Sequence, residues 1–131
     1  MAFKYYNPGI GAVGSYQVSG QPWVSGSSLA AGQEHRIQFP FVTRAVTVAQ
    51  SGAVGNIRVH LVSTGSMVET PIRNYWEMNS NEDALTMNIK CTEIYISNGN
   101  GTQDSGYQIF AELTRIDPRM MYALTGSGIT K

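Results

Sequence analysis

Apolar and polar residues alternate through most of the chain between residues 35 and 116. A period of two residues is typical of a β-strand that buries one face and exposes the other. In the segment 85–89 (LTMNI) the apolar residues take odd positions, whereas in 93–97 (EIYIS) both isoleucines take even positions. A flat strand cannot bury both sets, because a shift of one residue moves every side chain to the opposite face. We therefore predict a corner or β-bulge at residues 90–92.

Further short strands are predicted by the same alternation, and turn residues separate them. The Asn-Gly pairs in 98–101 favour a hairpin loop, since both residue types tolerate positive φ. Pro40 lacks an N–H and marks an edge or a break between strands. The remaining predicted strands lie at 35–39, 42–50, 57–62, 75–78 and 107–113. Seven to eight short strands, often about ten residues apart, predict an all-β fold: an antiparallel β-sandwich with a jelly-roll-like topology.

Residues 1–33 differ from this pattern. They contain a single charged residue, Lys4, together with six glycines and several aromatic residues. Glycine at this density opposes a helix and weakens strands, whereas a disordered tail would carry more charge and fewer aromatic rings. We interpret residues 1–33 as an extended arm with one short strand near residues 15–19. The arm could wrap its own domain or reach a neighbouring subunit, and the sequence leaves both open.

The sandwich is expected to span residues 34–116, and the segment 117–131 to form a short C-terminal helix and a tail. Asp117 is a suitable N-cap residue, Pro118 suits the first helical position, and Gly126 can end the helix. The residues between them predict about two helical turns. No linker or internal repeat divides the 131 residues of the chain, so we expect a single domain.

Charged residues make up only 14% of the chain, and the formal net charge is zero. Soluble domains usually carry about 25% charged residues. A neutral, charge-poor surface argues against a nucleic-acid partner, because nucleic acids are bound by neutralising their phosphates. It also favours a surface that other subunits cover. The N-terminus lacks the apolar region of a secretory signal, and no run reaches the roughly 18 apolar residues of a membrane span. We therefore expect synthesis in a cytoplasm and no membrane partner.

Few residues have the chemistry of a catalytic site. The two histidines, His35 and His60, lie in separate predicted strands without metal-ligand spacing, and we expect both on polar faces of the sheet. Cys91 is the single cysteine, so no disulfide forms within the chain; at the strand corner it suggests a half-buried structural thiol. A Ser/His/Asp triad could assemble from distant strands, but no nucleophile elbow points to one. We predict no catalytic residue.

Two motifs bear on ligands. Residues 9–14 match G-x-G-x-x-G, but Pro8 precedes them and no helical pattern follows, so a dinucleotide site lacks its strand and its helix. The loop 98–104 spaces oxygen-bearing side chains as a calcium loop does, but it has one carboxylate and no closing glutamate. The sequence thus predicts neither a cofactor nor a metal. A sugar-stacking platform stays open for the aromatic residues Trp23, Tyr75 and Trp76.

Four stretches carry a resemblance to a known family: 14–24 (GSYQVSGQPWV), 39–45 (FPFVTRA), 93–97 (EIYIS) and 111–116 (AELTRI). Together they resemble small virion structural proteins of tailed bacteriophages, particularly marine ones. The resemblance implies a β-sandwich protein without enzymatic activity. Such a protein is bound to a capsid as a decoration or cement protein, or forms part of a head fibre or tail. The implied partner is a major capsid protein or another virion protein, and the implied assembly is a homo-oligomer, often a trimer. Its implied localisation is the virion, after synthesis in the host cytoplasm.

The resemblance brings no catalytic residues and no defined contact motif. Contact residues are therefore predicted from the two segments whose composition suits a covered surface. In the arm they are Phe3, Tyr5, Tyr6, Val13, Tyr16 and Trp23, and in the C-terminal segment they are Met120, Met121, Tyr122 and Leu124. The alternative function is a carbohydrate-binding or receptor-binding module of a fibre, tail or adhesin tip. A small β-sandwich hydrolase is a third possibility.

Overall fold

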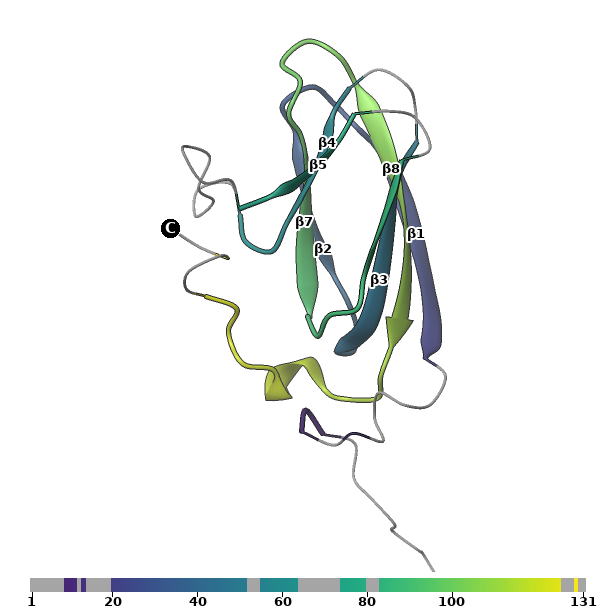
Figure 1. Cartoon of the computed structure of the whole chain (residues 1–131), viewed down its shortest axis with the longest axis vertical. Coiled ribbons are helices and arrows are strands. Elements are labelled where there is room, and N and C mark those ends of the chain that lie inside the picture. The colour runs from purple at the N-terminus through teal and green to yellow at the C-terminus, as the bar shows by residue number, and fades with distance from the viewer. Residues whose placement is uncertain are drawn as a thin grey trace, which may run out of the picture.

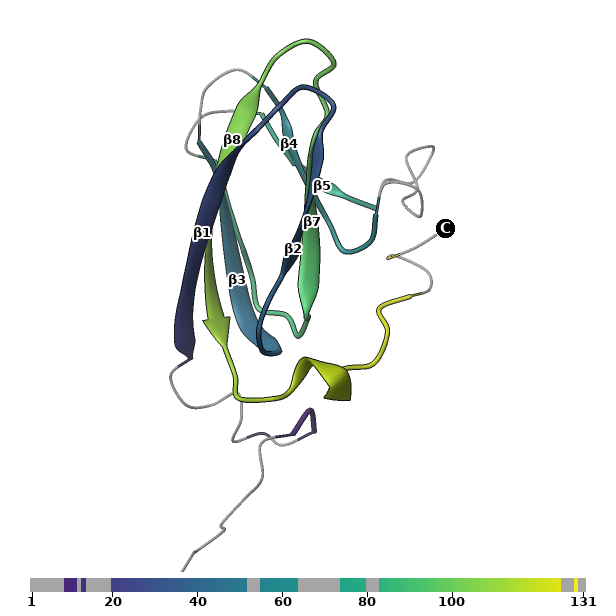
Figure 2. The same ribbon diagram turned by 180° about the vertical axis from the view of Figure 1, so that it is seen from behind.

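The computed structural model describes residues 9–11, 13, 20–51, 55–63, 74–79, 83–125 and 129. In these residues, eight strands form two antiparallel sheets that face each other as the layers of a β-sandwich (Figure 1 and, from behind, Figure 2). The first sheet has the order β1 (Gln21–Leu29), β8 (Ser105–Leu113), β3 (Thr43–Ser51), β6 (Ala84–Met87). The second has the order β2 (Glu34–Gln38), β7 (Glu93–Asn98), β4 (Ile57–His60), β5 (Trp76–Met78). The predicted all-β antiparallel sandwich is thus confirmed.

The core lies between the two sheets and is filled from alternate positions of each strand. In the first sheet Val48 of β3 pairs with Ile109 of β8, and in the second Ile96 of β7 pairs with Val59 of β4. All four side chains are at most 4% exposed. Branched side chains fit the pleated, half-buried surface of a strand, so the alternation read from the sequence is the one that closes the core.

The predicted corner at residues 90–92 is the point where the chain leaves one sheet for the other. β6 belongs to the first sheet and β7 to the second. Thr43 of β3 secures the corner: its hydroxyl donates to the carbonyl of Ile89 at 2.9 Å and accepts from the backbone N–H of Cys91 at 3.1 Å. Cys91 is fully buried, deeper than the half-buried position expected, because its side chain turns into the space between the sheets.

Stability is expected to fall at alkaline pH because of three buried or half-buried acids. Burial raises the pKa of the Cys91 thiol and of the Tyr107 and Tyr95 phenols above their ordinary values. Below the unfolded-state pKa values the resulting stabilisation is fully present. As pH rises above about 8.5 for cysteine and about 10 for tyrosine, the unfolded chain ionises first and the stabilisation is lost. Urea denaturation across this pH range measures the free energy of unfolding. Cys91→Ala should remove the part of its decrease that begins near the pKa of cysteine. A free energy of unfolding that stays constant over the range would contradict this.

The loop after β7 differs from the predicted hairpin. β7 and β8 lie in different sheets, so residues 98–104 arch over one end of the sandwich instead of joining neighbouring strands. Asn98 holds the arch from inside: its Nδ2 donates to the carbonyls of Leu29 at 3.3 Å and Gln103 at 2.7 Å, and its Oδ1 accepts from the N–H of Asn100. Asn-Gly chemistry specifies a reversal of the chain, and the pairing of β8 with β1 and β3 decides which sheet the chain enters next.

The N-terminal boundary of the sandwich lies earlier than expected. β1 (Gln21–Leu29) pairs with β8 over all nine of its residues, so this part of the expected arm 1–33 is a sheet strand. Long-range pairing stabilises a segment whose serines and glycine have little strand propensity of their own. The short strand expected near residues 15–19 lies outside the described residues.

The C-terminal segment forms one 3-10 turn, η2 (Pro118–Met120), in place of two helical turns. Asp117 caps it by accepting from the N–H of Arg119 at 2.9 Å, and the hydrogen bonds from Arg119 lower the pKa of Asp117 to about 2. Met121 is already extended. After β8 the chain crosses below one end of the sandwich toward the second sheet, and the extended path lets Leu124 pack against the core (Figure 1). No described helix is long and apolar enough to span a membrane.

Candidate interaction surfaces

The arm residues predicted to make contacts are only partly described. Phe3, Tyr5, Tyr6 and Tyr16 lie outside the described residues. Val13 is 65% exposed, which leaves it available to a partner.

Trp23 does not occupy the exposed position that a contact residue or a sugar platform requires. It is half-buried and packs edge-on against Phe39, with ring centroids 5.1 Å apart, on the inner side of β1. Trp76 by contrast is 59% exposed, and Tyr75 lies under the guanidinium of Arg58 at 4.5 Å. Of the three aromatic residues considered for stacking, Trp76 is therefore the one with an open ring.

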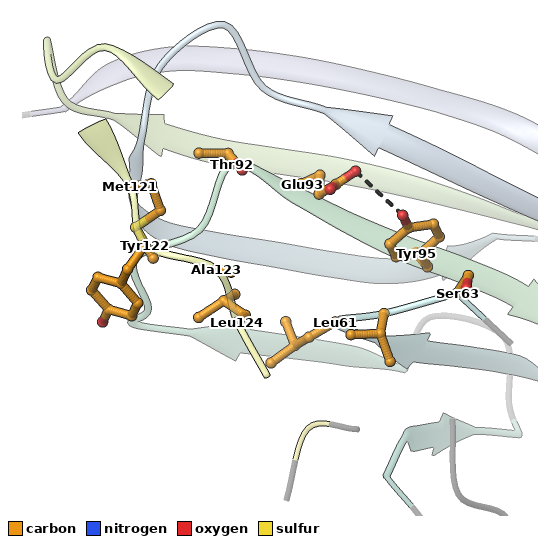
Figure 3. Close-up of a pocket in the computed structure, with 10 residues that line it drawn as sticks. Leu61, Ser63, Thr92, Glu93, Tyr95, Met121, Tyr122, Ala123 and Leu124 are labelled. Atoms are coloured by element: carbon orange, nitrogen blue, oxygen red, sulfur yellow. Dashed lines mark hydrogen bonds between the residues drawn. The ribbon is translucent and has the colours of Figure 1, made fainter. Parts of the chain in front are cut away.

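The predicted C-terminal patch is divided between exposed and anchoring side chains. Met120 and Tyr122 are 54% and 59% exposed, whereas Met121 and Leu124 are half-buried. Figure 3 shows Leu124 turned toward Leu61, while the ring of Tyr122 points away. Leu124 thus holds the segment against the sandwich, and Met120 and Tyr122 are free for a partner.

A groove of about 440 Å³ runs between this segment and the outer face of the second sheet. Glu93 is its acidic residue, and its carboxylate accepts from the hydroxyl of Tyr95 at 3.4 Å and pairs with Arg36 (Figure 3). Burial and the charge of Glu93 raise the pKa of Tyr95, so this phenol stays neutral at physiological pH. Because the carboxylate of Glu93 is paired with Arg36, its charge is neutralised. The groove therefore presents an apolar wall of Leu61 and Leu124 beside this ion pair.

The first sheet exposes two apolar side chains that the sequence analysis did not select. Val24 of β1 is 71% exposed and Phe110 of β8 is 47% exposed, and the two are register partners on the outer face. The exposure of Phe110 could have been read from the alternation, because Phe110 shares the parity of the polar residues Gln108 and Glu112. A single exposed apolar residue is common, but Val24 and Phe110 lie side by side and form a small apolar patch, which is typical of an interaction surface.

Among the described strands, β1 is an edge strand of the first sheet, and it carries no charged side chain. Natural proteins usually protect such an edge with lysine, proline or a short strand, because its free N–H and C=O groups can pair with another chain. Here Pro22 protects one end only. Pro22 has no N–H to donate, so it fits a position whose backbone groups point away from β8. Backbone orientation repeats every second residue and the β1–β8 register is continuous, so the N–H and C=O groups of Val24, Gly26 and Ser28 also point away from β8.

The two histidines occupy structural positions. His35 faces the interior, where its Nδ1 lies 2.8 Å from the hydroxyl of Tyr107 in the opposite sheet, so the expected polar face was wrong for His35. It shares the parity of the buried Ile37, and this could have been read from the alternation. His60 lies on the outer face of its sheet but is 2% exposed.

His60 forms the hydroxyl–imidazole contact that a hydrolase would need. Its Nε2 is 2.9 Å from Ser97 Oγ, and its Nδ1 contacts the carbonyl of Val62. The Ser97 hydroxyl, the His60 imidazole and the Val62 carbonyl thus stand in the order nucleophile, base and orienting group. However, Ser97 is only 6% exposed and the imidazole is stacked on Tyr95, so the contact mainly satisfies buried polar atoms.

The oxygen-rich loop 98–104 uses its oxygens for its own turns. Asn100 Oδ1 accepts from the N–H groups of Thr102 and Gln103, and Asp104 Oδ1 accepts from the N–H of Ala31. Among the described residues, no group of three or more His, Cys, Asp or Glu side chains could hold a metal ion.

No protein-family model matches the chain, and no curated protein matches it. Among solved structures, the chain is similar to the crystal structure of the Yersinia pseudotuberculosis-derived mitogen. The two share 11% sequence identity over 73% of this chain and 88% of that chain, with a TM-score of 0.41. A similarity of this strength carries no argument about function or partners.

Proposed function

We propose that this chain is a non-enzymatic virion structural protein that binds a capsid surface as a decoration or cement protein. The observation that carries the proposal is the β1 edge: nine residues without a charge, with no described strand paired to their outer side. A neighbouring capsid chain can add a strand to such an edge, and backbone hydrogen bonds then supply the affinity. Val13 of the arm and the exposed Met120 and Tyr122 of the C-terminal segment would add apolar contacts elsewhere on the surface.

We also propose a jelly-roll topology for the sandwich, and the strand order supports it. In the two sheets, β1-β8-β3-β6 and β2-β7-β4-β5, sequential strands lie in opposite layers except β4 and β5, which is the arrangement of a double Greek key. In a capsid lattice each copy contributes the same weak contacts many times. Such repetition raises the effective concentration of every further contact, so no covalent chemistry is needed to reinforce the shell.

The edge and the arm can be tested on capsids that lack this chain. Deletion of residues 1–13 should leave a folded sandwich that no longer attaches. Ser28→Pro should lower occupancy by about tenfold or more, because it removes an outward N–H from β1 without breaking a β1–β8 bond. Ser28→Ala keeps that N–H and serves as the matched control. Normal occupancy by both altered chains would disprove binding through the arm and edge.

Occupancy is best counted by quantitative mass spectrometry of purified particles, relative to the major capsid protein. Hundreds of copies would support a decoration or cement role. A few to a few dozen copies would reassign the protein to a fibre, tail or vertex. Complete absence would defeat the virion assignment.

A second candidate function, carbohydrate or receptor binding, is favoured by the position of Trp76. Its exposed ring borders an apolar cleft of about 280 Å³, which Val59, Met87 and Ile89 also line. A glycan array tests it, with Trp76→Ala expected to abolish binding. The interior Trp23 cannot stack on a sugar, so loss of binding only in Trp23→Ala would contradict this site.

A further inference from the structure

The outer face of the first sheet has an uncharged centre. Two rows of outward residues cross its four strands in register. The first row is Val24, Phe110, Thr47 and Thr86, and the second is Gly26, Gln108, Ala49 and Ala84. Within the first row the hydroxyls of Thr47 and Thr86 lie 3.0 Å apart and satisfy each other. A sheet face in contact with water normally carries charged side chains, so this face has the composition of a covered surface.

The same face combines a projection with a hollow. Val24 and Phe110 project from the first row, and a depression of about 360 Å³ lies beside them. It is lined by the small residues Gly26 and Ala49 and by the side chain of Gln108, which stands between them. The backbone maintains this depression at Gly26, where an added Cβ would come within 2.9 Å of the carbonyl oxygen of Tyr107. The hollow thus lies one row from the ring of Phe110, about two residues along the strands, or roughly 7 Å.

We propose that two copies of this chain pack face to face through this surface about a two-fold axis. Each Phe110 ring then enters the hollow of the other copy. A two-fold contact requires one patch that is complementary to itself, and a projection beside a hollow of suitable size meets that requirement. The lack of charge in the two rows removes the like-charge repulsion that a self-contact would otherwise create. At one end of the face Arg44 and Glu112, 3.9 Å apart, balance each other in charge.

The size of the face suits a weak to moderate homodimer. Strands about 4.8 Å apart, rising about 3.3 Å per residue, give the two protomers a combined contact of roughly 1,000 Å² when the whole outer face takes part, and the two uncharged rows supply about half of it. This is near the lower limit for a specific interface. A two-fold pair also replaces the trimer implied by the family resemblance, because a closed trimer needs two different complementary surfaces.

This inference does not depend on the proposed capsid role. The pair uses the face of the first sheet and leaves the β1 edge open, so self-association and capsid attachment can be lost separately. Failure of the Ser28→Pro capsid test would leave the pairing intact, and failure of pairing would leave the capsid test intact.

Sedimentation equilibrium of the full chain tests the pairing. We expect a concentration-dependent dimer, and Phe110→Asp should raise its dissociation constant by at least about tenfold, because a charge would enter the hollow. Ala49→Tyr fills the hollow and should have the same effect. Trp76→Asp alters another exposed aromatic residue, 59% exposed against 47% for Phe110, and is the matched control. Far-UV circular dichroism confirms that each variant is folded.

Three results would overturn the proposal. They are a wild-type chain that stays monomeric up to millimolar concentration, a dimer whose dissociation constant is unchanged in Phe110→Asp and Ala49→Tyr, and a trimer. Equal weakening by the Trp76→Asp control would also count against it, because the effect would then not belong to this face.

Discussion

Replacing Ile96 by alanine is expected to lower the free energy of unfolding by about 2–5 kcal/mol. Ile96 is fully buried on β7, the strand that pairs with both β2 and β4 in the second sheet. The truncated side chain would leave a cavity that the neighbouring strands cannot fill, since two ladders fix the backbone on both sides. A small domain has about 5–15 kcal/mol of stability in total, so the variant should be marginally folded.

Urea denaturation followed by tryptophan fluorescence measures this effect. Ile96→Val at the same position is the matched control and should lower the free energy of unfolding by only about 0.5–1.5 kcal/mol. An alanine variant within about 0.5 kcal/mol of the wild type would show that Ile96 does not lie in the core between the sheets.

Replacing Asn98 by aspartate is expected to lower the free energy of unfolding by about 3 kcal/mol or more at neutral pH. The amide nitrogen of Asn98 donates to the carbonyls of Leu29 and Gln103, and the residue is 3% exposed. A carboxylate at this position would bring a buried negative charge against two carbonyl oxygens. Burial should raise the pKa of the new carboxyl group, and its protonated form can donate one hydrogen bond. The loss of stability should therefore become smaller as pH falls.

Asn100→Asp is a matched control in the same loop. Asn100 uses its Oδ1 as an acceptor from Thr102 and Gln103, and a carboxylate preserves that role. The change loses only the hydrogen bond that Asn100 Nδ2 donates to Gln103 Oε1 near the surface. We expect a change within about 0.5 kcal/mol. If thermal or urea denaturation gave the two aspartate variants equal stability at neutral pH, Asn98 would not be the residue that holds the arch.

The strands predicted from alternation between residues 35 and 116 lie close to those in the structure. Alternation is a local property, and a strand with one buried face must show it wherever it pairs. The change of parity between Ile89 and Ile94 located the corner for the same reason. The missed strand β1 had only a partial alternation, with Pro22 and Gly26 against it, and its nine pairs with β8 override that weak local preference.

The predicted contact surface was recovered less well. The C-terminal residues Met120 and Tyr122 are exposed as expected, because they lie in a short segment that cannot bury every apolar side chain. Trp23 and Val24 are neighbours and must point to opposite faces of β1, but alternation alone does not say which face is inside. Trp23 takes the inner side and packs on Phe39, and its contact with a partner stays a prediction.

The sequence by itself determined the all-β class, most strand positions, the corner at Cys91 and the low charge of the surface. Each of these depends on residues close together in the chain. Only the tertiary structure decided which strands share a sheet, that Asn98 spans an arch, and that Val24 and Phe110 meet on an open face. Those features arise from contacts between residues distant in the chain, and the free energy of packing selects among pairings that local patterns allow equally.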